Sequence, residues 1–366
     1  MKIKAFILKH KRLFKLLLPL RNIYHQTALF VQYKRILKKT SAQKKYIFYI
    51  GIPVHNNLGD LAQGVCIRKW IRESYPNREV IELETDCLVN TKLPLINQLK
   101  QCYQKDDIII FQSGYTTTDL GGFADEMHRA VITALPNAKI LMMPQTIFFQ
   151  DQQKQNETSF VYNRAKNMLF LARDRISFEL AIKMFPDIRV KLFPDIVTSM
   201  IGTRVPSLQR EGILFCCRDD TEKYYSEEEL NGLIEKCRKQ VLVHITDTTK
   251  KGNAKDIVRD AKKYIEKEID SYGKYKLIIT DRYHGTIFSL IAGTPVILIK
   301  TTDHKVITGG EWFKGVYDTH VFIANDLDEA YDLATKIIDT NINYTLVPYF
   351  KEKYYDKLRK ILEEEN

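Results

Sequence analysis

The first 59 residues of this 366-residue chain contain no aspartate or glutamate, although they contain 13 lysines and arginines. Removing those 13 from the 56 basic residues of the chain leaves 43 bases against 45 acids, a net charge of −2. The excess positive charge therefore belongs to one terminal arm. Because a nucleic-acid groove requires basic residues on the folded body, we expect no nucleic acid as a partner.

Several patterns that would indicate other functions are also missing. The six cysteines form no C-x-x-C pair, so no zinc site of that kind is expected. The dinucleotide-binding pattern G-x-G-x-x-G is absent. No run of about 20 apolar residues is long enough to span a membrane, and Lys15 interrupts the best candidate for a signal peptide. We therefore expect neither a metal nor a cofactor.

Residues 1–45 form a basic arm ahead of the body. On a helical wheel, most apolar side chains of residues 1–18 share one face and six bases share the other. Pro19 is expected to end this helix. An amphipathic basic helix is typical of a segment that binds an anionic membrane surface. The alternative is a helix that docks on the body of the protein or on a partner.

From residue 46 onward, strand-like and helix-like segments alternate, which is typical of parallel sheets covered by helices. A Pro-containing linker at 203–211 separates two such runs. The sequence thus predicts an α/β fold of two Rossmann-like domains facing a cleft, over 46–205 and 206–345, followed by a C-terminal helix at 346–366. Ligands of such folds bind beyond the carboxyl ends of the strands.

Polar residues follow the first strand-like segment of the body. Among them are His55, Asn57, Gly59 and Asp60. One interpretation is a turn with a helix cap. The other is a pocket wall for a hydroxylated substrate, in which His55 or Asp60 accepts a proton.

A second polar loop follows the strand-like LIIT segment and contains Arg282, His284 and Gly285. A guanidinium offers a fork of donors to a carboxylate or phosphate, and an imidazole donates to an anion or moves a proton. Gly285 would let the N–H groups of the following helix face a ligand. These groups predict an anion-binding site.

Three more cations follow strand-like segments, namely Arg173, Arg218 and Lys305. Each alone is typical of a solvated or structural charge. Together they would line the cleft with positive charge, which suits an anionic small-molecule donor. Asp195, in an F-P-D motif, is expected to cap a turn.

The order of these motifs resembles one known family. N-x-G-D (57–60), Pro144-Gln145, R-D-x-x-S (173–177), F-P-D (193–195) and R-x-H-G (282–285) occur in sequence, with A-G-T-P-V and a lysine after them. This set resembles the polysaccharide pyruvyl transferases, whose fold is similar to that of GT-B glycosyltransferases. The resemblance covers about residues 46–320, which excludes the basic arm.

The resemblance implies transfer of the enolpyruvyl unit of phosphoenolpyruvate to two hydroxyls of one sugar, giving a pyruvate ketal and phosphate. The second domain would form the donor side, and the donor would be held by residues of the R-x-H-G loop and by the three other cations: Arg282, His284, Gly285, Arg173, Arg218 and Lys305. The first domain would hold the acceptor through Asn57, Gly59, Asp60 and Gln145. His284 is the candidate acid, and Asp60 or His55 the candidate base.

The resemblance also implies a place in the cell and leaves two alternatives. A lipid-linked oligosaccharide at the inner face of the cytoplasmic membrane would be a natural acceptor, with residues 1–18 on that surface. One alternative is a GT-B glycosyltransferase that uses a nucleotide sugar, with Glu311 available to hold a ribose. The other is a non-catalytic protein that docks an assembly complex on the membrane. Residues 112–122 depart from the Gly-rich run of many relatives, which bears on the acceptor.

Overall fold

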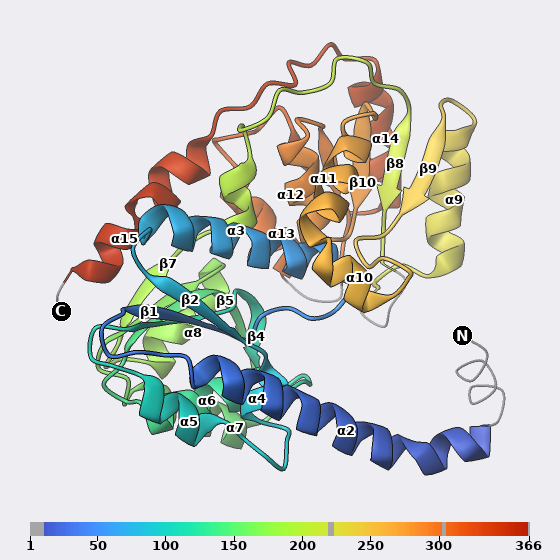
Figure 1. The fold of residues 1–366 in the computed structure, drawn as a ribbon. Helices are drawn as coiled ribbons and strands as arrows, with labels where there is room; N and C mark the ends of the chain where they lie inside the picture. Colours follow the sequence, from blue (N-terminus) through green and yellow to red (C-terminus); the bar gives the residue numbers. More distant parts are fainter. Residues whose placement is uncertain (1–10, 219–222, 302–304, 365–366) are drawn as a thin grey trace.

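The computed structural model describes residues 11–218, 223–301 and 305–364. These residues form two parallel β-sheets, of seven and five strands, each covered by helices (Figure 1). The first sheet belongs to the N-terminal half of the chain and the second to the C-terminal half. The predicted architecture of two Rossmann-like domains is confirmed.

The first sheet has the strand order β2-β1-β3-β5-β6-β7, and β4 pairs with the end of β5. Its strands are β1 (Tyr46–Ile50), β2 (Glu79–Leu83), β3 (Ile108–Phe111), β4 (Gly114–Thr118), β5 (Lys139–Phe148), β6 (Met168–Ala172) and β7 (Arg189–Leu192). Every pairing is parallel. β1 and β3 are buried along their whole length, because helices cover both faces of the sheet.

The second sheet has the strand order β12-β11-β10-β8-β9. Its strands are β8 (Ile213–Cys216), β9 (Val243–Thr246), β10 (Leu277–Thr280), β11 (Val296–Leu298) and β12 (Val321–Ile323), all paired in parallel. In both sheets the first strand lies between the second and the third. The strand order therefore reverses at β1/β3 and at β8/β10, and such switch points are where open α/β sheets bind ligands.

The helices divide between the two domains. Those of the first domain are α3 (Leu58–Ser74), α4 (Thr85–Leu88), α5 (Ile96–Cys102), α6 (Ala124–Ala134), α7 (Gln152–Tyr162), α8 (Arg175–Met184) and the 3-10 helix η1 (Ile196–Met200). Those of the second are α9 (Glu227–Arg238), α10 (Ala254–Arg259), α11 (Ala261–Tyr272), α12 (Tyr283–Ile291), α13 (Lys305–Gly310), the 3-10 helix η2 (Glu311–Phe313) and α14 (Leu327–Ile338).

The two domains share one apolar core across their interface. Leu61 and Ile67 of α3 belong to the same buried cluster as Ile265 and Ile269 of α11 and Ile287 of α12. Figure 1 shows α3 lying between the two sheets, next to α11 and α12. This shared core holds the strand ends of the two sheets toward each other.

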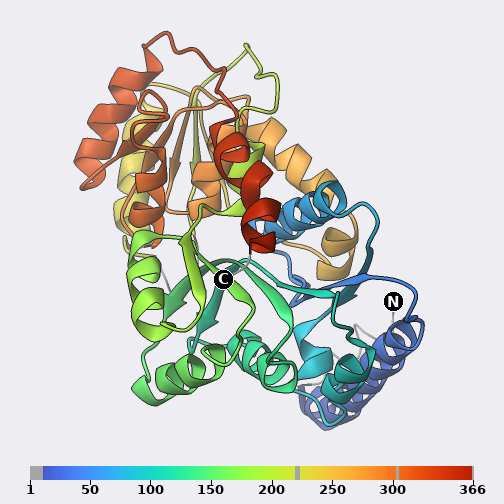
Figure 2. The same ribbon diagram turned by 90° about the vertical axis from the view of Figure 1, so that its left-hand side faces the viewer.

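The C-terminal segment returns from the second domain to the first. It forms the π-helical turn η3 (Lys351–Tyr355) and α15 (Asp356–Glu363), which lie against α3 (Figure 2). The indole of Trp70 donates to the carbonyl oxygen of Tyr355 at 3.1 Å, and Arg359 donates to the carbonyl oxygen of Ser74 at 2.7 Å. The helix predicted after residue 346 thus packs on the first domain.

The N-terminal helix α2 (Lys11–Leu37) continues through Pro19, so the expectation that Pro19 ends the helix is wrong. A proline removes one helical hydrogen bond at a cost of about 3 kcal/mol, which a 27-residue helix anchored further along tolerates. The anchor is the buried set Leu29, Tyr33 and Leu37, and Tyr33 donates to Glu84 at 2.7 Å. The C-terminal half of α2 is therefore docked on the first domain.

The N-terminal half of α2 extends past the edge of the first domain (Figure 1). Most of the predicted membrane-binding segment, residues 1–10, lies outside the described residues. Within residues 11–218, 223–301 and 305–364, no helix has the length and apolar character that a membrane span requires.

Candidate functional site

A cavity of about 280 Å³ lies between the two domains, at the carboxyl ends of both sheets. Apart from Tyr115, which lies in β4, its lining residues follow strands or begin helices. The full lining is Asn57, Asp60, Tyr115, Arg173, Arg218, Thr248, Thr249, Arg282, Tyr283 and His284. Six of the residues predicted from the two polar loops and from the cations after strands therefore meet here, namely Asn57, Asp60, Arg173, Arg218, Arg282 and His284. This cavity is the candidate functional site.

The R-x-H-G loop connects β10 directly to α12. Arg282 is the residue before the helix, and its backbone N–H donates to the Thr280 hydroxyl at 3.0 Å. A Cβ at position 285 would overlap that hydroxyl, so Gly285 allows α12 to start close against β10. Gly285 does not line the cavity, but it allows the start of α12 to pack against the end of β10.

The Arg282 guanidinium is oriented by a carboxylate that sequence reasoning missed. Its Nη2 atom donates to Asp247 Oδ2 at 2.7 Å, and both side chains are mostly buried. Asp247 directly follows β9. The other candidates were predicted because they follow strands, and the same position would have indicated Asp247. A charge-assisted bond in this partly buried position limits the directions in which Arg282 can point.

Arg218 and Asp281 lie side by side at the switch point of the second sheet. The backbone N–H of Arg218 donates to Asp281 Oδ1 at 2.9 Å. Burial raises the pKa of Asp281 to about 6, although Arg218 and Arg282 act in the opposite direction. This carboxyl, which does not itself line the cavity, is therefore more readily protonated than an exposed aspartate.

Arg173 reaches the cavity from the end of β6 in the first domain. Its Nε and Nη2 atoms donate to the Thr146 hydroxyl at 3.0 and 2.6 Å, and its guanidinium lies 5.1 Å from the centre of the Tyr283 ring. Trp312 of the second domain donates to the Arg173 carbonyl oxygen at 2.8 Å. In the R-D-x-x-S motif, Asp174 caps α8, so the motif supports the position of Arg173.

Asp195 is fully buried beneath the cavity, and it lies close to two of the lining residues, Arg173 and His284. Its Oδ2 atom accepts a hydrogen bond from Arg173 at 3.4 Å and lies 3.5 Å from His284 Nε2. Burial alone would raise the pKa of Asp195, but His284 and Arg173 outweigh it and hold the pKa well below the usual range. The predicted turn-capping role is present too, because Asp195 accepts from Val197 N–H.

The N-x-G-D motif forms the start of α3 on the opposite wall. Asn57 caps the helix by accepting from Gly59 N–H at 2.9 Å, and Asp60 lines the cavity. A Cβ at position 59 would overlap the His284 ring, so glycine leaves room for that imidazole. Both interpretations of this loop, helix cap and pocket wall, are thus combined in one turn.

The two domains also pair through backbone atoms beside this wall. Leu58 N–H donates to the Thr248 carbonyl oxygen at 3.0 Å, and Asn57 and Thr249 form an antiparallel bridge. Thr248, Thr249 and Tyr115 line the cavity but were not predicted. The two threonines follow β9, so their position after a strand was the available signal, whereas Tyr115 lies within β4.

Three predicted residues lie elsewhere or are undescribed. His55 is not among the lining residues; its side chain is 55% exposed, and Nε2 lies 3.5 Å from Asp60 Oδ2. Gln145 is fully buried, and its amide donates to the carbonyl oxygens of Gln112 and Met143 at 2.6 and 2.9 Å, within the first sheet. The side chain of Lys305, at the start of α13, lies outside the described residues.

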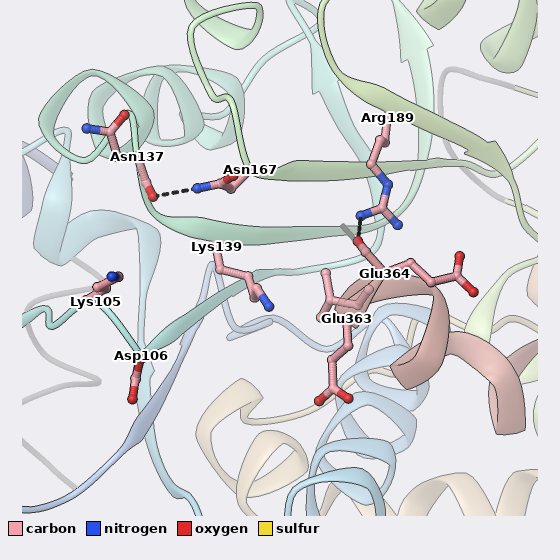
Figure 3. A pocket seen from close by; sticks show the side chains of 9 residues that line it. Lys105, Asp106, Asn137, Lys139, Asn167, Arg189, Glu363 and Glu364 are labelled. Atoms are coloured by element: carbon pink, nitrogen blue, oxygen red, sulfur yellow. Dashed lines mark hydrogen bonds between the residues drawn. The ribbon is translucent and has the colours of Figure 1, made fainter. Parts of the chain in front are cut away.

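A larger hollow of about 840 Å³ occurs at the opposite end of the first sheet (Figure 3). Its lining combines bases such as Lys139 and Arg189 with acids such as Asp106 and Glu363, and Arg189 donates to the Glu364 carbonyl oxygen at 2.6 Å. Amino ends of strands and mixed charge do not fit the ligand-binding edge of an α/β sheet. We therefore place the site at the smaller cavity.

The chemistry of the site follows from its charges. Three guanidinium groups and one imidazole converge on a small space, which suits a ligand with more than one anionic group. Asn57, Asp60, Tyr115 and the two threonines also line the cavity and offer hydrogen-bonding groups of the kind that hold hydroxyls. Across the parts of the chain that the structure describes, no group of three or more His, Cys, Asp or Glu could hold a metal ion.

The chain is similar to several known proteins. The chain is 27% identical to general stress protein 30 of Bacillus subtilis over 305 residues, covering 82% of this chain and 87% of that protein. It is 23% identical to pyruvyl transferase 1 of Schizosaccharomyces pombe over 321 residues, covering 83% and 78%. A UDP-GlcNAc 2-epimerase structure from Methanocaldococcus jannaschii covers 87% of this chain and 99% of that one, with 10% identity and a TM-score of 0.48.

The family comparison spans both walls of the cavity. The match begins at Asn57, at the start of α3, and includes the R-x-H-G loop of the second domain. Residues 57–304 match the polysaccharide pyruvyl transferase family, and this chain belongs to that family.

Proposed function

We propose that this protein transfers the enolpyruvyl unit of phosphoenolpyruvate to two hydroxyls of one sugar, forming a pyruvate ketal and phosphate. The observation that carries the proposal is the convergence of Arg173, Arg218, Arg282 and His284 on one cavity between the domains. Phosphoenolpyruvate carries a carboxylate and a phosphate on three carbons. Each anionic group needs its own cationic partner, and the cavity offers enough for both.

The reaction balances without another reactant. A proton adds to the methylene carbon of the donor, and a sugar hydroxyl attacks the resulting cationic centre and loses its own proton. The C–O bond to phosphate then breaks, the second hydroxyl attacks the same carbon, and its proton is taken up by the released phosphate. One general acid and one general base are sufficient for these steps.

The residues of the two walls suit these roles. His284 faces the cavity from the donor side and is the candidate acid or phosphate ligand. Asp60 is the candidate base, because it lines the cavity from the first domain, the proposed acceptor side. His55, 3.5 Å from Asp60, would act only through that carboxylate.

The size of the cavity favours this donor over a nucleotide sugar. At about 280 Å³ it lies just below the roughly 300–1,000 Å³ of drug-sized ligand pockets. Glu311, the residue expected to hold a ribose in a glycosyltransferase, lines a separate hollow with Arg175 and Trp312. A small, doubly anionic donor is the better match.

The test compares donors directly. The full chain is incubated with a bacterial lipid-linked oligosaccharide extract and either phosphoenolpyruvate or a panel of nucleotide sugars. We expect phosphate release and a glycan heavier by one pyruvyl ketal. Nucleotide release from a sugar donor, with phosphoenolpyruvate left intact, would refute the proposal in favour of a glycosyltransferase.

We further propose that the protein works at the inner face of the cytoplasmic membrane, on a lipid-linked acceptor. The basic composition of residues 1–18 and the extension of α2 past the first domain support this. Because Leu29, Tyr33 and Leu37 are part of the first-domain core, a truncation should remove only residues 1–20.

The membrane test measures sedimentation with phosphatidylglycerol vesicles. We expect the full chain to sediment with them and the truncated chain to stay in solution while keeping phosphoenolpyruvate binding. A variant with alanine at the exposed positions Lys262, Lys263 and Lys267 controls for loss of positive charge elsewhere. Equal sedimentation of the truncated and full chains would contradict a membrane role for the arm.

A further inference from the structure

The buried carboxylate of Asp195 joins four separate elements beneath the cavity. Oδ2 accepts from Gln63 Nε2 of α3 at 2.6 Å and from Arg173 Nη1, after β6, at 3.4 Å. Oδ1 accepts from Val197 N–H of η1 at 2.9 Å, and His284 Nε2 of α12 lies 3.5 Å from Oδ2. The carboxylate is therefore the common neighbour of Arg173 and His284, the two cavity groups that come from different domains.

Three groups donate hydrogen bonds to the Asp195 carboxylate, from Gln63, Arg173 and Val197. An ionised carboxylate can only accept hydrogen bonds, and the Arg173 guanidinium, which forms an ion pair with Asp195, favours the ionised form. His284 Nε2 is buried and has no hydrogen-bond partner among the described residues, and the ionised Asp195 carboxylate, 3.5 Å away, favours a proton on this nitrogen. The other ring nitrogen, Nδ1, lies beside Gly59 at the start of α3.

We propose that Asp195 is a positioning residue, whose carboxylate holds the Nε2–H form of His284 and fixes the His284 ring and the Arg173 guanidinium relative to each other across the cavity. Its side chain has no exposed surface and does not line the cavity, so it acts through these two residues. The catalytic consequence rests on the proposed function, whereas the proton position on His284 does not.

The surroundings of Asp195 make its replacement by asparagine informative. Asparagine has the same shape but presents one NH₂ group in place of an oxygen. In one orientation that NH₂ meets Val197 N–H; in the other it meets Gln63, Arg173 and His284. Either orientation places donor against donor, so no rearrangement of the amide can restore both sets of contacts.

The experiment combines histidine NMR with kinetics on the full chain carrying Asp195→Asn. With ¹⁵N-labelled histidine at alkaline pH, and the signal assigned through His284→Gln, we expect the wild type to show protonated Nε2. We expect Asp195→Asn to shift proton density toward Nδ1. We expect kcat for phosphate release to fall about 100-fold, the scale that a misplacement of about 1 Å produces.

Asp125→Asn provides the matched control for loss of a buried carboxylate. Asp125 is buried in the same domain and accepts from Arg129 at 2.9 Å and from Thr158 at 2.8 Å, away from the cavity. Both variants should lower the melting temperature, but Asp125→Asn should leave the His284 signal and kcat nearly unchanged.

The outcomes separate this inference from the proposed function. If the wild type does not turn over phosphoenolpyruvate, the NMR measurement still tests the pairing of Asp195 with His284. If the His284 signal and kcat of Asp195→Asn match those of Asp125→Asn, Asp195 is only a structural residue and the inference is overturned.

Discussion

The imidazole of His284, from the second domain, occupies the space that a side chain at Gly59 of the first domain would need. The two residues belong to the N-x-G-D and R-x-H-G motifs, which lie more than 200 positions apart in the chain. Their contact explains why position 59 holds a glycine, since any larger side chain would overlap the His284 ring. It also means that the position of the His284 ring depends on how the two domains are packed.

Replacing Gly59 by alanine should therefore displace His284 and impair catalysis. We expect kcat/KM to fall by about 100-fold, because the new methyl group would force the ring out of position. Steady-state phosphate release measures this. Gly232→Ala, in α9 and with open space at its Cβ, should leave activity unchanged and stabilise the helix by about 1 kcal/mol. Full activity in Gly59→Ala would show that the ring can move without consequence.

Changing Arg282 to lysine should weaken donor binding while keeping the positive charge. Lysine cannot reproduce the planar fork that Arg282 holds toward Asp247 and the cavity. Loss of one hydrogen bond to a charged group, about 1.5–3 kcal/mol, predicts roughly 10- to 100-fold weaker binding of phosphoenolpyruvate. Calorimetry without acceptor gives the dissociation constant.

The exposed Arg259, in α10, provides the comparison for the Arg282 variant. Arg259→Lys should bind phosphoenolpyruvate as the wild type does. Polymer modification that persists in cells carrying Arg282→Ala would favour the non-catalytic docking role over an enzyme.

The buried Asp281 should make stability depend on pH. Burial raises its pKa from 3.8 to about 6 in the folded chain, so the folded state binds the proton more tightly than the unfolded state. Its favourable contribution is complete below about pH 4 and is lost as the pH rises through 6. The loss above pH 6 should approach about 3 kcal/mol.

Asp281→Asn mimics the protonated form and tests this sign. The free energy of unfolding of the variant, relative to the wild type, should increase between pH 4 and pH 8. Denaturant unfolding at both pH values measures the difference, in which contributions from other groups largely cancel. A difference that is independent of pH would mean that Asp281 is already ionised in the folded chain near pH 4.

The docking of α2 should contribute measurably to stability. Tyr33→Phe removes the hydrogen bond to Glu84 and leaves a partly buried carboxylate without that donor, so we expect a loss of about 1 kcal/mol. Tyr24→Phe, at an exposed position of the same helix, should have no effect. Equal stability of the two variants would indicate that α2 is not held at this position in solution.

The sequence alone was sufficient for the fold class and for the two main loops of the site. Continuous apolar runs such as those of β1, β3 and β10 arise because parallel strands are buried on both faces, and this property is visible locally. Ligands of such sheets bind beyond the carboxyl ends of the strands, and the polar residues after the predicted strands include Asp60, Arg173, Arg218, Arg282 and His284. The resemblance among the ordered motifs identified the family.

Only the tertiary structure decided which side chains face the cavity. Gln145 turns into the first sheet, His55 is largely exposed, and Asp195 and Asp247 hold the cations of the site. Pro19 lies within a helix that is anchored by residues further along the chain. These outcomes depend on contacts between segments distant in the chain, such as Asp195 and His284, which are 89 positions apart. The direction of a side chain is set by what packs against it rather than by its neighbours in sequence.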